Sequence, residues 1–133
     1  MSADVFLDTN VLVYAFAAED RRSARAIDLL GRGGIVSVQV LGEFVHVGRT
    51  KLHREWTEIR EQLTVLRQLL GDPVSVTGDV HRIALDIAEE SGYRFYDSQI
   101  IAAALAANCK TLYSEDLQHG RRIESLTIAN PFL

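Results

Sequence analysis

Four acidic residues occupy positions at which their side chains could gather at one place in a folded chain. Asp8 directly follows the apolar run Val5-Phe6-Leu7, and Asp116 closely follows a second apolar run, which ends at Tyr113. Glu43 lies within a stretch of helical apolar spacing, and Asp97 stands just before another. Taken singly, each acid has an ordinary structural explanation: a turn residue at Asp8, a helix cap at Asp97, and the solvent edge of a helix at Glu43.

Clustered carboxylates repel one another unless some of them take up protons or bind a cation. Ligands that offer only oxygen atoms favour Mg²⁺ or Mn²⁺. An ion of this kind suits phosphodiester hydrolysis, because it orients and deprotonates water and stabilises the charge that develops on phosphate. The single cysteine and four histidines form no zinc-ligand pattern. The sequence also contains no Ser-His-Asp elbow, Walker loop or Gly-rich dinucleotide loop.

The elements that must position these acids alternate between strands and helices. Val5-Phe6-Leu7 is a short strand, and Thr9 and Asn10 are residue types that cap the helix after it. This alternation predicts an α/β fold, a single-domain three-layer α/β/α sandwich over residues 1–133 with a mainly parallel sheet. Right-handed crossovers then place all the strand ends on one edge, with Asp8 and Asp116 among them. Further strands are predicted over residues 35–38, 74–76, 110–113 and 123–129, and helices over residues 11–17, 21–30, 39–51, 55–70, 79–91 and 97–106.

The overall composition constrains the class of protein. The chain has 133 residues, of which 47% are hydrophobic and 24% charged, with a net charge of −4. This balance argues against a generally basic coat that binds nucleic acid. The longest apolar runs are well short of the ~20 residues of a membrane span, and no secretory signal is recognisable. One cysteine, Cys109, fits a reducing compartment, so we expect a cytoplasmic protein with no membrane contact.

Basic residues occur in local groups that could bind the phosphates of a substrate. A solvated helix face is the alternative explanation for each group. The candidates are Arg21, Arg22 and Arg25, then Arg49, Lys51 and Arg54, and finally Arg121 and Arg122 near Asp116.

Several motifs in this order resemble those of the PIN domain. They are Leu7-Asp8-Thr9-Asn10-Val11-Leu12, the helix with Glu43, Tyr96-Asp97-Ser98-Gln99-Ile100-Ile101 and Leu112-Tyr113-Ser114-Glu115-Asp116-Leu117. The closing residues 126–132 resemble the end of small bacterial VapC toxins. The resemblance implies a Mg²⁺- or Mn²⁺-dependent endoribonuclease, the toxin of a type II toxin–antitoxin pair. It also implies a homodimer and inhibition by a small VapB-like antitoxin.

The resemblance also assigns roles to residues. It makes Asp8, Glu43, Asp97 and Asp116 the acidic quartet that binds the metal, supported by Thr9, Asn10 and Ser114. Many members carry another acid two or three positions after the fourth, where this chain has Gln118 and His119. We therefore expect one metal ion rather than two.

Two other functions fit some of these features. A PIN-like module that binds RNA or a partner without cutting would not need four mutually repelling acids. A phosphatase with an aspartyl nucleophile commonly uses Asp-x-Asp after the first strand, whereas this chain has Asp8-Thr9-Asn10.

Overall fold

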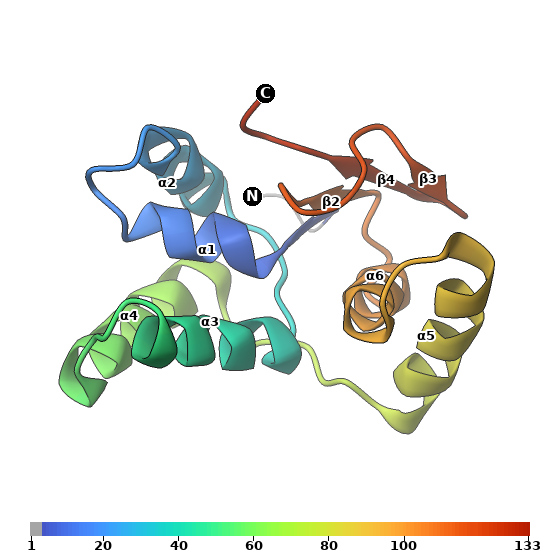
Figure 1. Cartoon of the computed structure of the whole chain (residues 1–133), viewed down its shortest axis with the longest axis horizontal. Helices are drawn as coiled ribbons and strands as arrows, with labels where there is room; N and C mark the ends of the chain where they lie inside the picture. The colour runs from blue at the N-terminus through green and yellow to red at the C-terminus, as the bar shows by residue number, and fades with distance from the viewer. Residues whose placement is uncertain (1–3) are drawn as a thin grey trace.

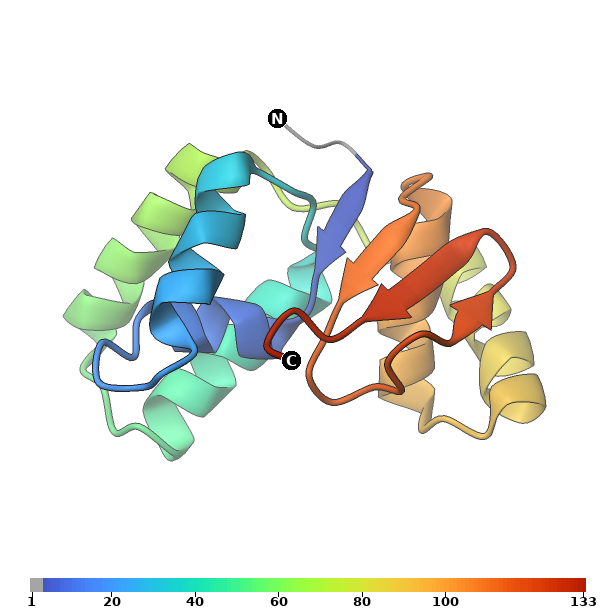
Figure 2. The same cartoon turned by 90° about the horizontal axis from the view of Figure 1, so that it is seen from above.

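A mainly parallel sheet lies at the centre of the computed structural model, which describes residues 4–133. Its strand order is β1 (Val5–Leu7), β2 (Thr111–Tyr113), β4 (Leu126–Ala129) and β3 (Arg122–Ile123), as Figure 2 shows. β1, β2 and β4 run parallel, and β3 pairs antiparallel with β4. The predicted domain over residues 1–133 includes residues 1–3, which lie outside the described part. No helix within residues 4–133 combines the length and apolarity needed to cross a membrane.

Six helices within residues 4–133 flank this sheet, and Figure 1 shows them in two groups. Their bounds are α1 (Thr9–Ala15), α2 (Ser23–Arg32), α3 (Val38–Thr50), α4 (Trp56–Leu70), α5 (Gly78–Ser91) and α6 (Phe95–Ala106). α1 contacts α2 and α3, α4 contacts α2 and α3, and α5 packs along α6. The predicted α/β class, with helices on both sides of a mainly parallel sheet, is confirmed.

The predicted strands over residues 35–38 and 74–76 are reduced to isolated parallel bridges. Ile35 pairs with Phe6, and Ser37 pairs with Val74. The first segment is short because α3 already begins at Val38, where the Ser37 hydroxyl accepts a hydrogen bond from the Val40 N–H at 3.3 Å. The chain therefore leaves the sheet after these isolated bridges and enters α3, the helix that carries Glu43.

The final predicted strand, over residues 123–129, is also divided. A two-residue turn at Glu124 and Ser125 folds β3 back onto β4, so that Ile123 faces Leu126. Glu124 has a φ of 52°, in the left-handed region that such hairpin turns require. The prediction of one continuous strand is wrong at this point, because alternation alone does not reveal a reversal of direction.

α6 is the most deeply buried helix, as its nearly uniform apolar sequence predicts. Every residue from Ser98 to Ala104 is buried. Three consecutive alanines, Ala102 to Ala104, allow neighbouring elements to approach closely, and Cys109 is buried just beyond the helix end. This tight packing fixes the start of α6, which carries Asp97.

Candidate active site

Asp8 lies at the carboxyl end of β1 and is 5% exposed. Its Oδ1 accepts a hydrogen bond from the Thr9 N–H, and its Oδ2 accepts one from the Ser114 hydroxyl, both at 2.7 Å. Asp8 is therefore the N-cap of α1, and the prediction that Thr9 and Asn10 cap this helix is wrong, since both lie inside its first turn. Burial raises the pKa of Asp8 to about 6, against the hydrogen bonds from Ser114 and Thr9 and helped by the charges of Glu43 and Asp116.

The sheet register brings Asp8 and Ser114 together. Leu7 pairs with Tyr113 in the parallel ladder, and the Asp8 N–H continues it by donating to the Tyr113 carbonyl at 3.0 Å. The residues that follow the two strands are therefore neighbours at one edge of the sheet. This register is the reason why a residue near the start of the chain meets one near its end.

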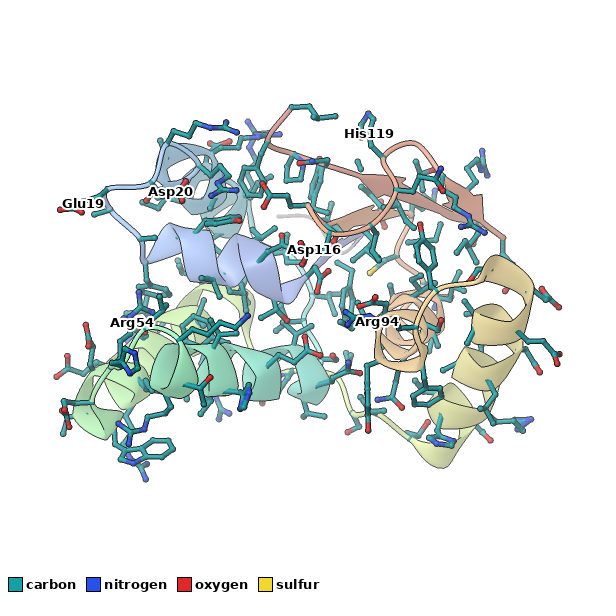
Figure 3. The ribbon with its side chains drawn as sticks, viewed as in Figure 1. Glu19, Asp20, Arg54, Arg94, Asp116 and His119 are labelled. Carbon is teal, nitrogen blue, oxygen red and sulfur yellow. The ribbon has the colours of Figure 1, made fainter. Side chains whose placement is uncertain are left out.

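Asn10 and Ser114 hold the loop that carries Asp116. The Asn10 amide donates to Asp116 Oδ2 at 3.1 Å, and its carbonyl accepts from the Glu115 N–H at 3.2 Å. The Ser114 hydroxyl accepts from the Asp116 N–H at 3.1 Å while it donates to Asp8. The predicted supporting residues Asn10 and Ser114 thus connect two of the four acids, and the Asp116 side chain remains exposed (Figure 3).

Glu43 joins this group through Thr9, whose hydroxyl donates to Glu43 Oε1 at 2.7 Å. Its other oxygen, Oε2, accepts from the Gln39 amide at 2.9 Å. Gln39 in turn accepts from the Gln99 amide at 2.8 Å and donates to the Tyr96 carbonyl at 3.0 Å. Two glutamines therefore fix Glu43 of α3 against the first turns of α6.

Asp97 lies in the first turn of α6, not at its cap. The helix begins at Phe95, with Arg94 in the cap position and no capping hydrogen bond from a side chain. The Asp97 side chain is 23% exposed, and its Oδ2 accepts from Arg94 Nε at 3.3 Å. Capping therefore does not account for Asp97, and its carboxylate is available to the groove described next.

All four acids line one groove with a volume of about 1110 Å³. Its walls come from the starts of α1 and α6, from α3 and from the loop after β2; Figure 3 shows Arg94 at the start of α6 and Asp116 beside α1. The lining residues are Asp8, Thr9, Asn10, Val13, Tyr14, Glu43, His46, Val47, Lys51, Arg94, Tyr96, Asp97 and Asp116. Within residues 4–133, no three Asp, Glu, His or Cys side chains are arranged as ligands of one ion. The acids thus share a groove without forming a closed coordination shell.

An ionic cluster adjoins this groove at Tyr14 and holds the loop that carries Asp116. Arg22 Nη1 donates to both carboxylate oxygens of Glu115, and the Arg22 guanidinium lies 3.9 Å from the centre of the Tyr14 ring. The Tyr14 hydroxyl also donates to Glu115, and Asp20 pairs with Arg22 at 2.8 Å. Burial opposes the ionisation of Glu115, but the hydrogen bonds from Tyr14 and Arg22 hold its pKa below the usual value.

Of the predicted phosphate-binding residues, only Lys51 lines the groove. The Arg22 guanidinium binds Glu115 and Asp20, and Arg25 donates to the Pro131 carbonyl at 3.2 Å. Arg49 donates to the Arg54 carbonyl, and Arg121 donates to the Ser91 carbonyl and stacks on Tyr93. Arg54, distant from Asp116 in Figure 3, donates to the Phe16 carbonyl. Arg21 and Arg122 are exposed outside the groove lining.

Sequence reasoning missed several residues in and around the groove, among them four where α3 meets the start of α6. They are Gln39, Gln99, Arg94 and Tyr96. The i, i+4 spacing of Gln39 and Glu43 on one helix was a usable signal for the first of them. Gln99 and Gln39 are 60 positions apart, and no local pattern relates them.

The mainly parallel α/β fold and the acidic groove at one edge of its sheet define an α/β protein with a candidate metal site. The comparison with known families agrees with this class. The PIN domain family matches residues 5–123, so the chain belongs to the PIN domain family. The sequence has no match among curated proteins.

Three solved structures have the same fold. They are VapC20 of Mycobacterium tuberculosis, described as a toxin that cleaves the sarcin-ricin loop, VapBC2 from Rickettsia felis bound to a DNA fragment from their promoter, and a toxin–antitoxin complex from Klebsiella pneumoniae. Their sequence identities to this chain are 21%, 21% and 18%, and their TM-scores are 0.69, 0.69 and 0.72. The matches cover 84%, 95% and 96% of this chain and 89%, 97% and 98% of theirs. At these identities the similarity concerns the fold.

Proposed function

We propose that this PIN domain is an endoribonuclease that depends on Mg²⁺ or Mn²⁺ and serves as the toxin of a toxin–antitoxin pair. The observation that carries the proposal is the convergence of Asp8, Glu43, Asp97 and Asp116 on one groove. A pure binding module gains nothing from an acid buried beside two other acids, where its pKa rises to about 6. The non-cleaving module is therefore the less favoured alternative.

The donor chemistry of the groove fits a hard divalent cation. All four candidate ligands are carboxylates, and Asp8 and Glu43 are held by hydrogen bonds that leave further lone pairs on their oxygens. Asp8, Asp97, Glu43 and Asp116 would hold the ion. When bound, it would supply an activated water and charge stabilisation at the phosphate.

Residues in and beside the groove orient these ligands. Thr9, Asn10 and Ser114 use hydroxyl and amide donors to set the orientation of Glu43, Asp116 and Asp8. Outer partners of this kind orient ligands and tune their basicity. Lys51 brings a positive charge to the groove, where a substrate phosphate must approach four acids.

The proposal includes partners and a location. We propose a homodimer, a small VapB-like antitoxin as inhibitor and a cytoplasmic location. The similarity in fold to VapBC2 from Rickettsia felis and to the Klebsiella toxin–antitoxin complex supports an antitoxin partner. A small open reading frame directly preceding this one would support it further, and size measurement of the complex after co-expression would test it.

The decisive experiment uses purified protein free of antitoxin, incubated with total RNA. We expect cleavage with Mg²⁺ or Mn²⁺, none with EDTA, and none for Asp8→Asn. Sequencing the new RNA ends tests the activity and identifies the substrate together. If no metal supports cleavage and Asp8→Asn keeps its cellular effect, the enzyme proposal is wrong and the binding module is favoured.

A further inference from the structure

Tyr96 is an exposed aromatic residue in the wall of the acidic groove. Its relative exposure is 66%, although it lies in the first turn of α6, two positions before the buried run that begins at Ser98. The next residue in the chain is Asp97, and both line the same groove as Asp8 and Asp116. An aromatic ring that is mostly exposed thus lies beside the proposed reaction centre.

The structure holds Tyr96 in place from two directions. Its ring contacts Phe95 edge-on, with centroids 5.4 Å apart and planes at 76°, and Phe95 packs against His81 at 5.0 Å. Its backbone carbonyl accepts a hydrogen bond from the Gln39 amide, which also donates a separate hydrogen bond to Glu43. A tyrosine side chain has few rotatable bonds, so little conformational freedom is lost when a ligand contacts it.

Basic residues line the groove from two elements. His46 lies in α3 and Lys51 directly after it, and Arg94 occupies the cap position of α6. Within the described residues, Lys51 makes no hydrogen bond or ion pair through its side chain, and Arg94 is 88% exposed with Asp97 as its ionic partner. Phosphates on either side of the reaction centre would therefore meet positive charge.

We propose that Tyr96 is a base-contacting residue of this groove, with one unpaired base of the RNA stacked on its ring and flanking phosphates at Arg94 and Lys51. This inference rests on the proposed ribonuclease function and adds the residues that contact the base and the phosphates. A base can stack on an aromatic side chain only when it is free of its own neighbours, as in loops and single strands. In an A-form duplex the base faces are covered, so a duplex gains nothing from Tyr96.

The test measures binding of a labelled single-stranded RNA oligonucleotide by fluorescence anisotropy. It uses Asp116→Asn protein, which we expect not to cleave, in Mg²⁺. Tyr96→Ala should weaken binding about tenfold, within the range for the loss of one stacking contact, and Tyr96→Phe should restore it. The matched control is Trp56→Ala, because Trp56 is 54% exposed and lies outside the groove lining, so its loss should leave binding unchanged. Duplex RNA of equal length should bind more weakly and be insensitive to Tyr96→Ala.

A spectroscopic readout reports stacking directly. Trp56 is the only tryptophan in the chain, so Trp56→Phe combined with Tyr96→Trp leaves one tryptophan, at position 96. Single-stranded RNA should quench its fluorescence, and duplex RNA should not. Unchanged binding by Tyr96→Ala, absence of quenching, or equal loss of duplex binding would each overturn the inference.

Failure of this inference is distinguishable from failure of the proposed function. If the wild-type protein cleaves RNA and Tyr96→Ala keeps its KM and kcat, the ribonuclease stands and the stacking site is wrong. If no RNA is cleaved but oligonucleotide binding depends on Tyr96, the stacking site stands and the nuclease is wrong.

Discussion

Arg22 joins the start of α2 to the loop that carries Asp116, because its Nη1 donates to both carboxylate oxygens of Glu115, at 2.9 and 2.8 Å. Glu115 and Asp116 are adjacent in the chain, and the Glu115 N–H donates a hydrogen bond to the Asn10 side-chain carbonyl, which fixes the backbone of this loop. Arg22 was a candidate for phosphate binding on sequence grounds. In the structure its guanidinium is occupied by Glu115, Asp20 and the Tyr14 ring, which makes it a positioning residue for Asp116.

Arg22→Ala should therefore slow RNA cleavage about tenfold to a hundredfold through kcat, since it loosens the loop without removing a groove residue. Binding of single-stranded RNA in the Asp116→Asn background should hardly change. Arg32→Ala is the charge-matched control, because Arg32 pairs with Asp28 in an exposed position on the same helix. A loss of RNA binding equal to the loss of cleavage would instead support the phosphate-binding role.

Asp8→Asn should make the metal-free protein more stable above pH 6. The pKa of Asp8 is raised from 3.8 to about 6, mainly by burial, so the folded state holds this proton more tightly than the unfolded chain. The free energy of unfolding then falls as the pH rises from about 4 to about 6 and levels off beyond. Two pKa units correspond to at most about 3 kcal/mol.

Urea unfolding in EDTA at several pH values measures this effect as the difference between variant and wild type. We expect that difference to grow in favour of Asp8→Asn between pH 4 and pH 7, while the variant shows no cleavage at any pH. A difference that does not vary with pH would mean that folding does not raise the pKa of Asp8.

Asp97→Asn should abolish cleavage and leave the stability of the fold nearly unchanged. Arg94, not Asp97, occupies the cap position of α6, and the ionic contact of Asp97 with Arg94 is at 3.3 Å beside an exposed side chain. Thr77→Ala is the informative comparison, because the Thr77 hydroxyl does cap α5 by accepting from the Val80 N–H at 3.2 Å. That loss should cost about 1 kcal/mol in thermal or urea unfolding. An equal cost for Asp97→Asn would restore the capping explanation.

Gln39→Ala should raise the concentration of Mg²⁺ needed for half-maximal cleavage, by about tenfold. The variant removes the donor to Glu43 Oε2 and the link to Gln99 while it keeps all four acids. Gln68→Ala serves as the control for an exposed glutamine on α4, outside the groove lining. If maximal activity falls at saturating Mg²⁺ with no change in the metal requirement, Gln39 does not act through Glu43.

Local patterns were sufficient for most of the architecture. The helical spacing of apolar residues located the six helices, and the deep burial of α6 followed from its nearly continuous apolar sequence. The errors fall where tertiary pairing decides the outcome. Residues 35–38 have the composition of a strand, but Ser37 caps α3 so early that only isolated bridges form. The hairpin at Glu124 depends on a left-handed backbone conformation that alternation does not encode.

The sequence by itself singled out the four acids as candidate ligands and placed them after strands or within the first two turns of helices, because these positions follow from short-range periodicity. Only the tertiary structure decided which side chains orient them. Ser114 reaches Asp8 across 106 positions, and Gln99 reaches Gln39 across 60. Such contacts depend on the register of the parallel ladder and on the packing of α6, which are properties of the whole fold. The packing of the whole fold also decides which surface residues reach the groove. Most of the predicted phosphate-binding arginines contact protein groups instead, whereas Tyr96 and Arg94 line the groove.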